Sequence, residues 1–252
     1  MSIPFPPTVF RARVPLRLGL AGGGTDLSPY CDEFGGAVLN TTIDRYAFAF
    51  LEPSPDDRIH LVAPDIEADE AFPVPAPDDP DPFPGARLVL HAGVLAGLRR
   101  RFGIALRPCR LTSFVDAPPG SGLGSSSALV VALVEACASA WALPLGPYDV
   151  AHLAYEIERL DLGLSGGKQD QYAAAFGGTN FIEFLSGDRV VVNPLRVPGR
   201  IRNELQTSLV ICFTGVSRRS DTIIDEQRRR ISVPAGARSG GTTNDAIESM
   251  HQ

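Results

Sequence analysis

The feature that most constrains this chain is a run of glycines and serines that leads directly into a long apolar helix. The run is Pro-Pro-Gly-Ser-Gly-Leu-Gly-Ser-Ser-Ser at Pro118–Ser127, and the segment Ser125–Trp141 is apolar on nearly every side of a helix. A helix with that pattern is buried. Alternating glycines let the backbone turn tightly and approach a ligand, and the free N–H groups at a helix start favour a phosphate. The sequence therefore predicts a phosphate-binding loop at the start of a buried helix.

The residues predicted to hold the phosphates are Pro119, Gly120, Ser121, Gly122, Leu123, Gly124, Ser125, Ser126 and Ser127. Serine hydroxyls are also suitable ligands for Mg²⁺. The loop is not a Walker A sequence, which requires Gly-Lys-Ser or Gly-Lys-Thr, and it is not the Gly-x-Gly-x-x-Gly fingerprint. A Rossmann-type dehydrogenase is therefore excluded. Taken alone, the loop also fits a simple tight turn, so the case for a phosphate depends on residues elsewhere.

The composition is that of an ordinary soluble globular protein, with 44% hydrophobic and 21% charged residues. The 252 residues suffice for one large domain or two small ones. The net charge of −6 argues against nucleic acid or a membrane surface as the main partner, because both require a basic face. The N-terminus lacks the features of a signal peptide, and the longest apolar run is shorter than the ~20 residues that a bilayer requires. Four scattered cysteines fit a reducing compartment, so we expect a cytoplasmic protein.

The elements expected along the chain mix strands and helices without a regular alternation. Strands are predicted at 9–20, 37–51, 59–62, 106–114 and 209–213, with a hairpin at 181–184 and 190–192. Helices are predicted at 87–102, at 125–141, from Pro147 onward and at 168–176. This order favours an α+β fold over a doubly wound sheet.

Two acidic residues follow the phosphate loop. Glu158 lies at the edge of the apolar face of its predicted helix, and Asp170 follows twelve residues later within Ser-Gly-Gly-Lys-Gln-Asp-Gln-Tyr. Taken singly, the first fits a solvated helix edge and the second a residue that starts a helix. Phosphoryl transfer needs a positioned phosphate chain, a divalent ion and a group that orients or deprotonates the acceptor. Together with Ser126, the two carboxylates would supply these.

A third glycine turn lies near the N-terminus, in Arg17-Leu-Gly-Leu-Ala-Gly-Gly-Gly-Thr-Asp26. A carboxylate such as that of Asp26 is a good acceptor for the hydroxyl groups of a substrate. The alternative is that the Thr-Asp pair only forms the turn.

These three segments together resemble the GHMP kinase superfamily. Within it, Pro15–Asp26 and Gly167–Gly178 resemble the D-glycero-α-D-manno-heptose 7-phosphate kinases, and the resemblance runs from about Arg11 to the chain end. It implies ATP and Mg²⁺ as cofactors and transfer of phosphate to the anomeric hydroxyl of heptose 7-phosphate, which gives the 1,7-bisphosphate. It also implies an N-terminal ribosomal-protein-S5-like domain over 1–200, followed by an incomplete ferredoxin-like domain over 201–252.

The resemblance assigns roles by position. Ser126 and Glu158 match the Mg²⁺ ligands, Asp170 matches the catalytic base, and Arg17 matches a cation near the transferred phosphate. The residues expected to bind the sugar phosphate are Gly24, Thr25, Asp26, Gly167, Lys168 and Arg218. For Arg218, the argument is that guanidinium binds phosphate through two hydrogen bonds, and the alternative is a solvated surface arginine. For Lys168, the alternative is a role in the fold of its motif.

The sequence departs from the superfamily at its end. Members carry a third glycine-rich motif of Gly-Ala-Gly-Gly-Gly type, and this sequence reaches Gln252 without it. We therefore expect a C-terminally truncated chain, either a fragment or a short and inactive product. Two alternatives stay open: a kinase for a galactose- or fucose-like sugar, and a non-catalytic protein that binds sugar or nucleotide. A homodimer is also left open.

Overall fold

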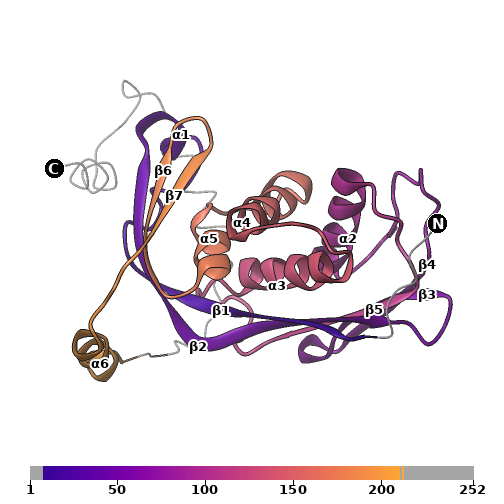
Figure 1. The fold of residues 1–252 in the computed structure, drawn as a ribbon, viewed down its shortest axis with the longest axis horizontal. Coiled ribbons are helices and arrows are strands. Elements are labelled where there is room, and N and C mark those ends of the chain that lie inside the picture. Colours follow the sequence, from indigo (N-terminus) through magenta and orange to yellow (C-terminus); the bar gives the residue numbers. More distant parts are fainter. Residues whose placement is uncertain (1–7, 211, 213–252) are drawn as a thin grey trace, which may run out of the picture.

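The computed structural model describes residues 8–210 and Cys212. It shows a strongly bent sheet of seven strands, with a layer of helices on its concave side (Figure 1). The strands follow the order β4-β3-β5-β2-β6-β7, and β1 pairs with the opposite edge of β2. Only β3 and β5 are parallel, so the sheet is mixed. The predicted α+β fold class is confirmed.

The strands are β1 (Phe10–Ala21), β2 (Gly36–Pro53), β3 (Arg58–Ala63), β4 (Ala68–Pro73), β5 (Cys109–Val115), β6 (Thr179–Leu185) and β7 (Arg189–Pro194). The long strand β2 is the spine of the sheet. Its first part, 36–41, pairs with β6, and its last part, 47–53, pairs with β5. Alternation explains the faces: in β1, Ala12, Val14 and Leu16 are buried, as expected for a side-chain period of two.

The helices are α1 (Tyr30–Phe34), α2 (Val89–Phe102), α3 (Ser125–Ala140), α4 (Pro147–Tyr155), α5 (Gln169–Phe176) and α6 (Gly199–Ser208), with a 3-10 turn η1 (Pro64–Ile66) and a π-helical turn η2 (Glu156–Asp161). α3 lies centrally on β1 and β2, with α2, α4 and α5 around it (Figure 1). Val130, Val131, Leu133 and Val134 are completely buried. The prediction of a buried helix after the glycine loop is therefore confirmed.

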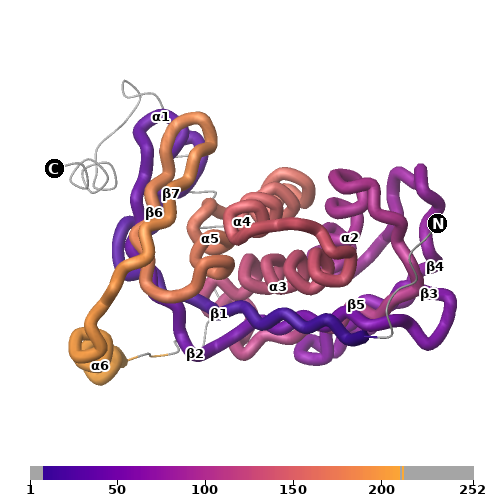
Figure 2. The backbone as a smooth tube through the Cα atoms, viewed as in Figure 1, coloured from indigo at the N-terminus to yellow at the C-terminus, as the bar shows by residue number. Residues whose placement is uncertain are grey.

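The strand predicted at 209–213 is wrong where the structure describes it. Leu209 and Val210 belong to no strand, and Val210 is 90% exposed. Apolar residues form a strand only beside a partner strand, and no described strand lies there. Instead, α6 precedes them, a polar helix with no buried residue that stands apart from the other helices (Figure 2). Neither α6 nor β4 was predicted.

The predicted domain boundary at residue 200 lies inside α6. Most of the predicted second domain, 201–252, lies outside the described residues, so the division stays a prediction. In the part of the chain that the structure describes, no helix is both long enough and apolar enough to cross a membrane.

Candidate active site

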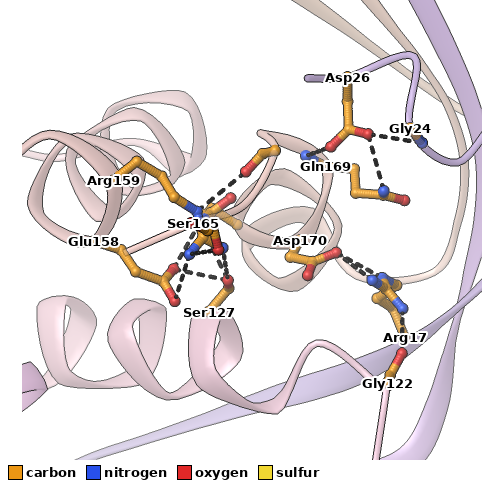
Figure 3. A network of polar contacts seen from close by, with 12 residues as sticks. Arg17, Gly24, Asp26, Gly122, Ser127, Glu158, Arg159, Ser165, Gln169 and Asp170 are labelled. Atoms are coloured by element: carbon orange, nitrogen blue, oxygen red, sulfur yellow. Dashed lines mark hydrogen bonds and ion pairs between the residues drawn. The ribbon is translucent and has the colours of Figure 1, made fainter. Parts of the chain in front are cut away.

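A cavity of about 470 Å³ lies where the phosphate loop, the turn after β1 and the segment from η2 to α5 meet. These segments are far apart in the sequence: Arg17 and Asp170, which are in contact here, are 153 residues apart. Many of the predicted site residues line the cavity, namely Arg17, Gly24, Asp26, Gly120, Gly122, Gly124, Ser125, Ser126, Ser127, Glu158, Gly167 and Asp170. The fold therefore brings the three predicted segments to one place (Figure 3).

The phosphate loop has the backbone that its glycines permit. Gly120, Gly122 and Gly124 have φ of 74°, 75° and 72°, in the left-handed region that favours glycine. Gly124 is the residue before α3, and no side chain caps that helix start. The first N–H groups of α3 are therefore free to bind an anion.

Three other residues of the predicted loop do not line this cavity. They are Pro119, Ser121 and Leu123. The carbonyl oxygen of Leu123 accepts a hydrogen bond of 3.1 Å from the backbone N–H of Arg17, which joins the loop to β1.

Glu158 lies on η2 and is completely buried. Its carboxylate accepts hydrogen bonds of 2.7 Å from the hydroxyls of Ser126 and Ser127 and from the side-chain amide of Gln171. Arg159 Nη1 lies 3.3 Å from Glu158 Oε1. Sequence reasoning placed Glu158 at the edge of an α-helix. The structure places it in the core, where donors from three elements surround it.

Ser126 and Glu158 fit a magnesium ion. Ser126 Oγ and Glu158 Oε1 are hard oxygen ligands 2.7 Å apart, close to the ~2.9 Å that separates neighbouring ligands around Mg²⁺ at its usual bond length. In the described residues, no group of three His, Cys, Asp or Glu side chains is placed to hold a metal by itself. A magnesium ion at this pair would therefore complete its coordination with phosphate oxygens and water.

Asp170 starts α5 and forms an ion pair with Arg17 from β1. Arg17 Nε lies 2.7 Å from Asp170 Oδ1, and Nη2 lies 2.5 Å from the same oxygen. Arg17 Nη1 also donates to the carbonyl of Gly122 at 2.8 Å, so it bridges the phosphate loop and α5. Because both contacts fall on Oδ1, Oδ2 faces the loop, where a Cβ at Gly124 would lie 3.5 Å from it. The side chain of Asp170 is 20% exposed.

Asp26 is 1% exposed and is held by backbone and amide donors. Its carboxylate accepts hydrogen bonds from the N–H of Gln169 at 3.0 Å, from the Gln169 side chain at 3.1 Å and from the N–H of Gly24 at 3.3 Å. Burial raises the pKa of Asp26, and the nearby charge of Asp170 raises it further. A Cβ at Gly167 would lie 1.9 Å from Asp26 Oδ2, so only glycine fits there.

Two residues predicted to bind the substrate face elsewhere. The hydroxyl of Thr25 lies within hydrogen-bond distance of the carbonyls of Gly22 in the turn, at 2.8 Å, and of Ala37 on β2, at 3.0 Å, and it does not line the cavity. Lys168 is nearly buried, with Nζ 2.5 Å from Asp188 and 3.3 Å from Asp32, also outside the cavity lining. Burial alone would lower the pKa of Lys168, but the hydrogen bond to Asp188 and the charge interactions with its neighbours together outweigh burial, so the pKa is raised. Arg218 lies outside the described residues.

Among the site residues that were not predicted, three bond through their side chains to the buried carboxylates of the site: Arg159, Gln169 and Gln171. Arg159 and Gln169 line the cavity, and Gln171 is completely buried beside Glu158. The only signal in the sequence was adjacency, since each lies next to a predicted carboxylate.

A second cavity of about 280 Å³ shares Gly120, Ser125 and Ser126 with the first. Its wall is mostly apolar and includes Ala63, Ile66, Leu88, Val89, Leu90, Val115, Pro119, Ala117 and Leu129. A buried polar pair also lines it, with His91 Nε2 and Ser113 Oγ 2.8 Å apart. Burial lowers the pKa of His91 to about 4. The site therefore has a polar chamber and an apolar chamber joined at the phosphate loop.

Comparison with known proteins agrees with this geometry. Residues 88–178 match the family model of the GHMP kinases N terminal domain. The chain is 42% identical over 223 residues to a D-glycero-alpha-D-manno-heptose 7-phosphate kinase of Campylobacter jejuni. The matched region covers 88% of this chain and 64% of that relative. The chain thus spans less than two thirds of the length of this curated relative.

Solved structures give the same result. A crystal structure described as a D-glycero-D-manno-heptose 1-phosphate kinase from Bacteroides thetaiotaomicron superposes with a TM-score of 0.77 at 44% identity, over 88% of this chain and 69% of that one. Lactococcus lactis galactokinase in complex with galactose shares the fold, with a TM-score of 0.60 at 18% identity over 81% of this chain and 58% of that one. The chain therefore belongs to the GHMP kinase superfamily.

Proposed function

We propose that the protein is an ATP-dependent kinase that phosphorylates the anomeric hydroxyl of D-glycero-D-manno-heptose 7-phosphate to give the 1,7-bisphosphate. The observation that carries the proposal is the single cavity in which the phosphate loop, the Ser126–Glu158 pair, Asp170 and Asp26 face one another. Both heptose kinases among the relatives support a heptose phosphate as acceptor, although their names place its phosphate differently.

The two chambers suggest how ATP would lie. The apolar cavity beside Pro119 and Gly120 suits a nucleobase, which buries well among aliphatic side chains. The phosphate chain would then cross the glycine loop to the start of α3, where the N–H groups are free. Ser126 and Glu158 would hold Mg²⁺ there. When bound, Mg²⁺ supplies positive charge that stabilises the phosphates during transfer.

Asp170 is placed to act as the base. The anomeric oxygen attacks the γ-phosphorus, the bond from that phosphorus to the ADP oxygen breaks, and the hydroxyl proton passes to Asp170 Oδ2. Arg17 holds Oδ1 and so fixes the orientation of the carboxylate. Its guanidinium also lies at the phosphate loop, through Gly122, where charge develops on the transferred group.

Asp26 would bind a sugar hydroxyl, because its buried carboxylate gains from each additional donor. The phosphate of the acceptor needs a cation. Among the described residues that line the cavity, the cations are Arg17 and Arg159, and both are bound to protein groups. We therefore assign this role to Arg218, which lies beyond the described residues.

The test is an acceptor screen with ATP and Mg²⁺, using heptose 7-phosphate, heptose 1-phosphate, unphosphorylated heptose, galactose and fucose. It should be run on this chain and on a version extended at its C-terminus. Turnover with heptose 7-phosphate alone is the expected result. Turnover only with galactose or fucose would favour the alternative acceptors, and ligand binding without turnover in both versions would favour a non-catalytic binding protein.

Asp170→Asn is expected to lower kcat about 10³-fold, because a general base contributes roughly 10²–10⁴-fold. The matched control is Asp57→Asn on the exposed turn between β2 and β3, which should leave kcat unchanged. Normal turnover in Asp170→Asn would remove the base from this mechanism.

A further inference from the structure

Arg159 lies between the metal-binding end of the cavity and the loop 163–167 (Figure 3). Its side chain is 9% exposed. At the metal-binding end, Nη2 donates to Ser127 Oγ at 3.0 Å and Nη1 pairs with Glu158 Oε1 at 3.3 Å. One guanidinium thus contacts both side chains that anchor this end.

The same guanidinium is surrounded by the loop. Nη1 donates to the carbonyls of Ser165 at 3.1 Å and Leu164 at 3.5 Å, and Nε donates to that of Gly167 at 3.4 Å. A Cβ at Gly166 would lie 2.1 Å from Arg159 Cζ, so the loop backbone packs directly against the guanidinium. A side chain at this position would therefore have to displace the guanidinium.

These contacts engage all three nitrogens of a side chain that has five N–H groups. The geometry therefore points to Arg159 as a residue that acts on the protein rather than on a bound phosphate. A lysine could not make the same contacts, because its single ammonium lacks the planar fork of donors.

The loop leads directly to the part of the cavity that contains Asp26, called the acceptor end here because the proposed function places the sugar there. Gly167 packs against Asp26 without room for a Cβ, and the N–H of Gln169, two residues later, donates to the same carboxylate at 3.0 Å. A shift of the loop would therefore move Asp26 or break its hydrogen bonds. A continuous path of contacts runs from Glu158 through Arg159 and the loop to Asp26.

We infer that Arg159 is a positioning residue that couples occupancy of the metal–nucleotide end to affinity at the acceptor end. The inference rests on the proposed function, which assigns those two ligands. Mg²⁺ and nucleotide at Ser126 and Glu158 favour one placement of Arg159, which contacts Glu158 and the neighbouring Ser127, and with it the loop placement that binds the sugar. By linkage, the acceptor strengthens nucleotide binding by the same factor.

The experiment measures the Kd of heptose 7-phosphate by calorimetry, with and without Mg²⁺ and a non-hydrolysable ATP analogue. In the wild type, the ligands should strengthen each other's binding. In Arg159→Lys, the coupling factor should fall to about one and the acceptor Kd with nucleotide present should rise about 10-fold, as is typical for residues that orient metal ligands. The Kd of the analogue without metal should change by less than about twofold.

Two further variants test the path itself. Arg100→Lys is the matched control, because Arg100 is 58% exposed and pairs with Asp161 outside the cavity; it should keep the wild-type coupling factor. In Gly166→Ala, the added methyl group would displace the Arg159 guanidinium from the loop side. This variant should therefore lose the coupling as Arg159→Lys does. In the double variant Arg159→Lys/Gly166→Ala, the acceptor Kd should be no higher than in either single variant, because both substitutions break the same contact.

A measurement without ligand separates this inference from the proposed function. Hydrogen–deuterium exchange of residues 163–167 should be faster in Arg159→Lys than in the wild type or Arg100→Lys. Unchanged exchange, or an unchanged coupling factor, would overturn the role of Arg159. Failure of the wild type to bind nucleotide would instead count against the proposed function, and the exchange comparison would still decide on Arg159.

Discussion

The two ends of the cavity each contain a buried carboxylate, and the two are held in different ways. Glu158 is 0% exposed and Asp26 is 1% exposed. Glu158 receives three side-chain hydrogen bonds and pairs with Arg159. Asp26 receives two backbone N–H groups and one amide, and in the part of the chain that the structure describes no cation pairs with it. Burial raises the pKa of Asp26.

The difference separates a structural anchor from a binding group. A buried charge with a counter-charge and a full set of donors is stable in the empty protein. A buried charge held only by neutral donors is improved by any further donor, and a sugar hydroxyl is one. The Glu158 end is therefore balanced in charge without a ligand, whereas the Asp26 end would gain stability from a bound hydroxyl group.

The largest effect should follow loss of the Glu158 charge. Glu158→Gln leaves Arg159 buried without its counter-charge, which typically costs about 3–5 kcal/mol, and it removes a proposed Mg²⁺ ligand. Urea denaturation measures the free energy of unfolding. The control is Glu156→Gln on the same turn, whose ion pair with Arg101 is partly exposed at 30% and 22% and should be worth under ~1 kcal/mol. Equal losses in the two variants would contradict the comparison.

A second effect concerns His91, a third buried titratable group, in the apolar chamber. Burial lowers its pKa to about 4, whereas an unfolded histidine titrates at about 6.5. The unfolded state therefore binds the proton more readily, so this stability is complete above about pH 6.5 and is lost as the pH falls toward about 4. The separation of the two pKa values corresponds to about 3 kcal/mol.

Urea unfolding of the wild type and His91→Gln between about pH 7 and pH 4 checks this. Over this pH range, the free energy of unfolding of the variant should fall by about 3 kcal/mol less than that of the wild type. His152→Gln, which changes a half-exposed histidine, should keep the full loss. Parallel pH curves for the wild type and His91→Gln would show that His91 does not titrate as described.

The smallest effect on stability should follow Asp26→Asn. The pKa of Asp26 is raised in the folded state, so its contribution to stability falls as the pH rises above ~3.9, the pKa of an unfolded aspartate. Asparagine does not titrate, so the substitution removes this dependence on pH. At neutral pH the free energy of unfolding should therefore change by less than ~1 kcal/mol. The KM for the acceptor should rise about 10-fold, equivalent to about 1.4 kcal/mol, with the KM for ATP unchanged. A loss of stability as large as that of Glu158→Gln would erase the distinction between the two ends.

The sequence predicted the local parts of this site well. The glycine loop and α3 were predictable because their signals, left-handed glycines and an apolar helix, lie in one short segment. Glu158, Asp170 and Asp26 were candidates from their positions near the glycine turns, and their roles were assigned by resemblance to a family. Their meeting in one cavity depends on the strand pairings of the sheet, and no local sequence pattern specifies those pairings.

Other roles depend on contacts that are distant in sequence. Lys168 was predicted to bind substrate because it lies beside Asp170, but its partners are Asp32 and Asp188, on α1 and the β6–β7 turn. Arg159 was missed because its role comes from Ser127, 32 residues away, and from a loop that folds back on it. The strand predicted at 209–213 shows the opposite error, since apolar residues suggested pairing that the described fold does not provide.

The long strand β2 limits how this protein can be trimmed. One of its edges pairs with β5, next to the apolar chamber, and with β6 of the hairpin β6–β7 farther along. The turn that carries Asp26 packs on the start of β2, where a Cβ at Gly36 would lie 1.9 Å from the carbonyl of Thr25. A shortened fragment that omitted the hairpin would expose an unpaired edge of β2 close to the turn that carries Asp26. The hairpin, although it lines neither chamber, therefore belongs to the smallest unit that can keep the site intact.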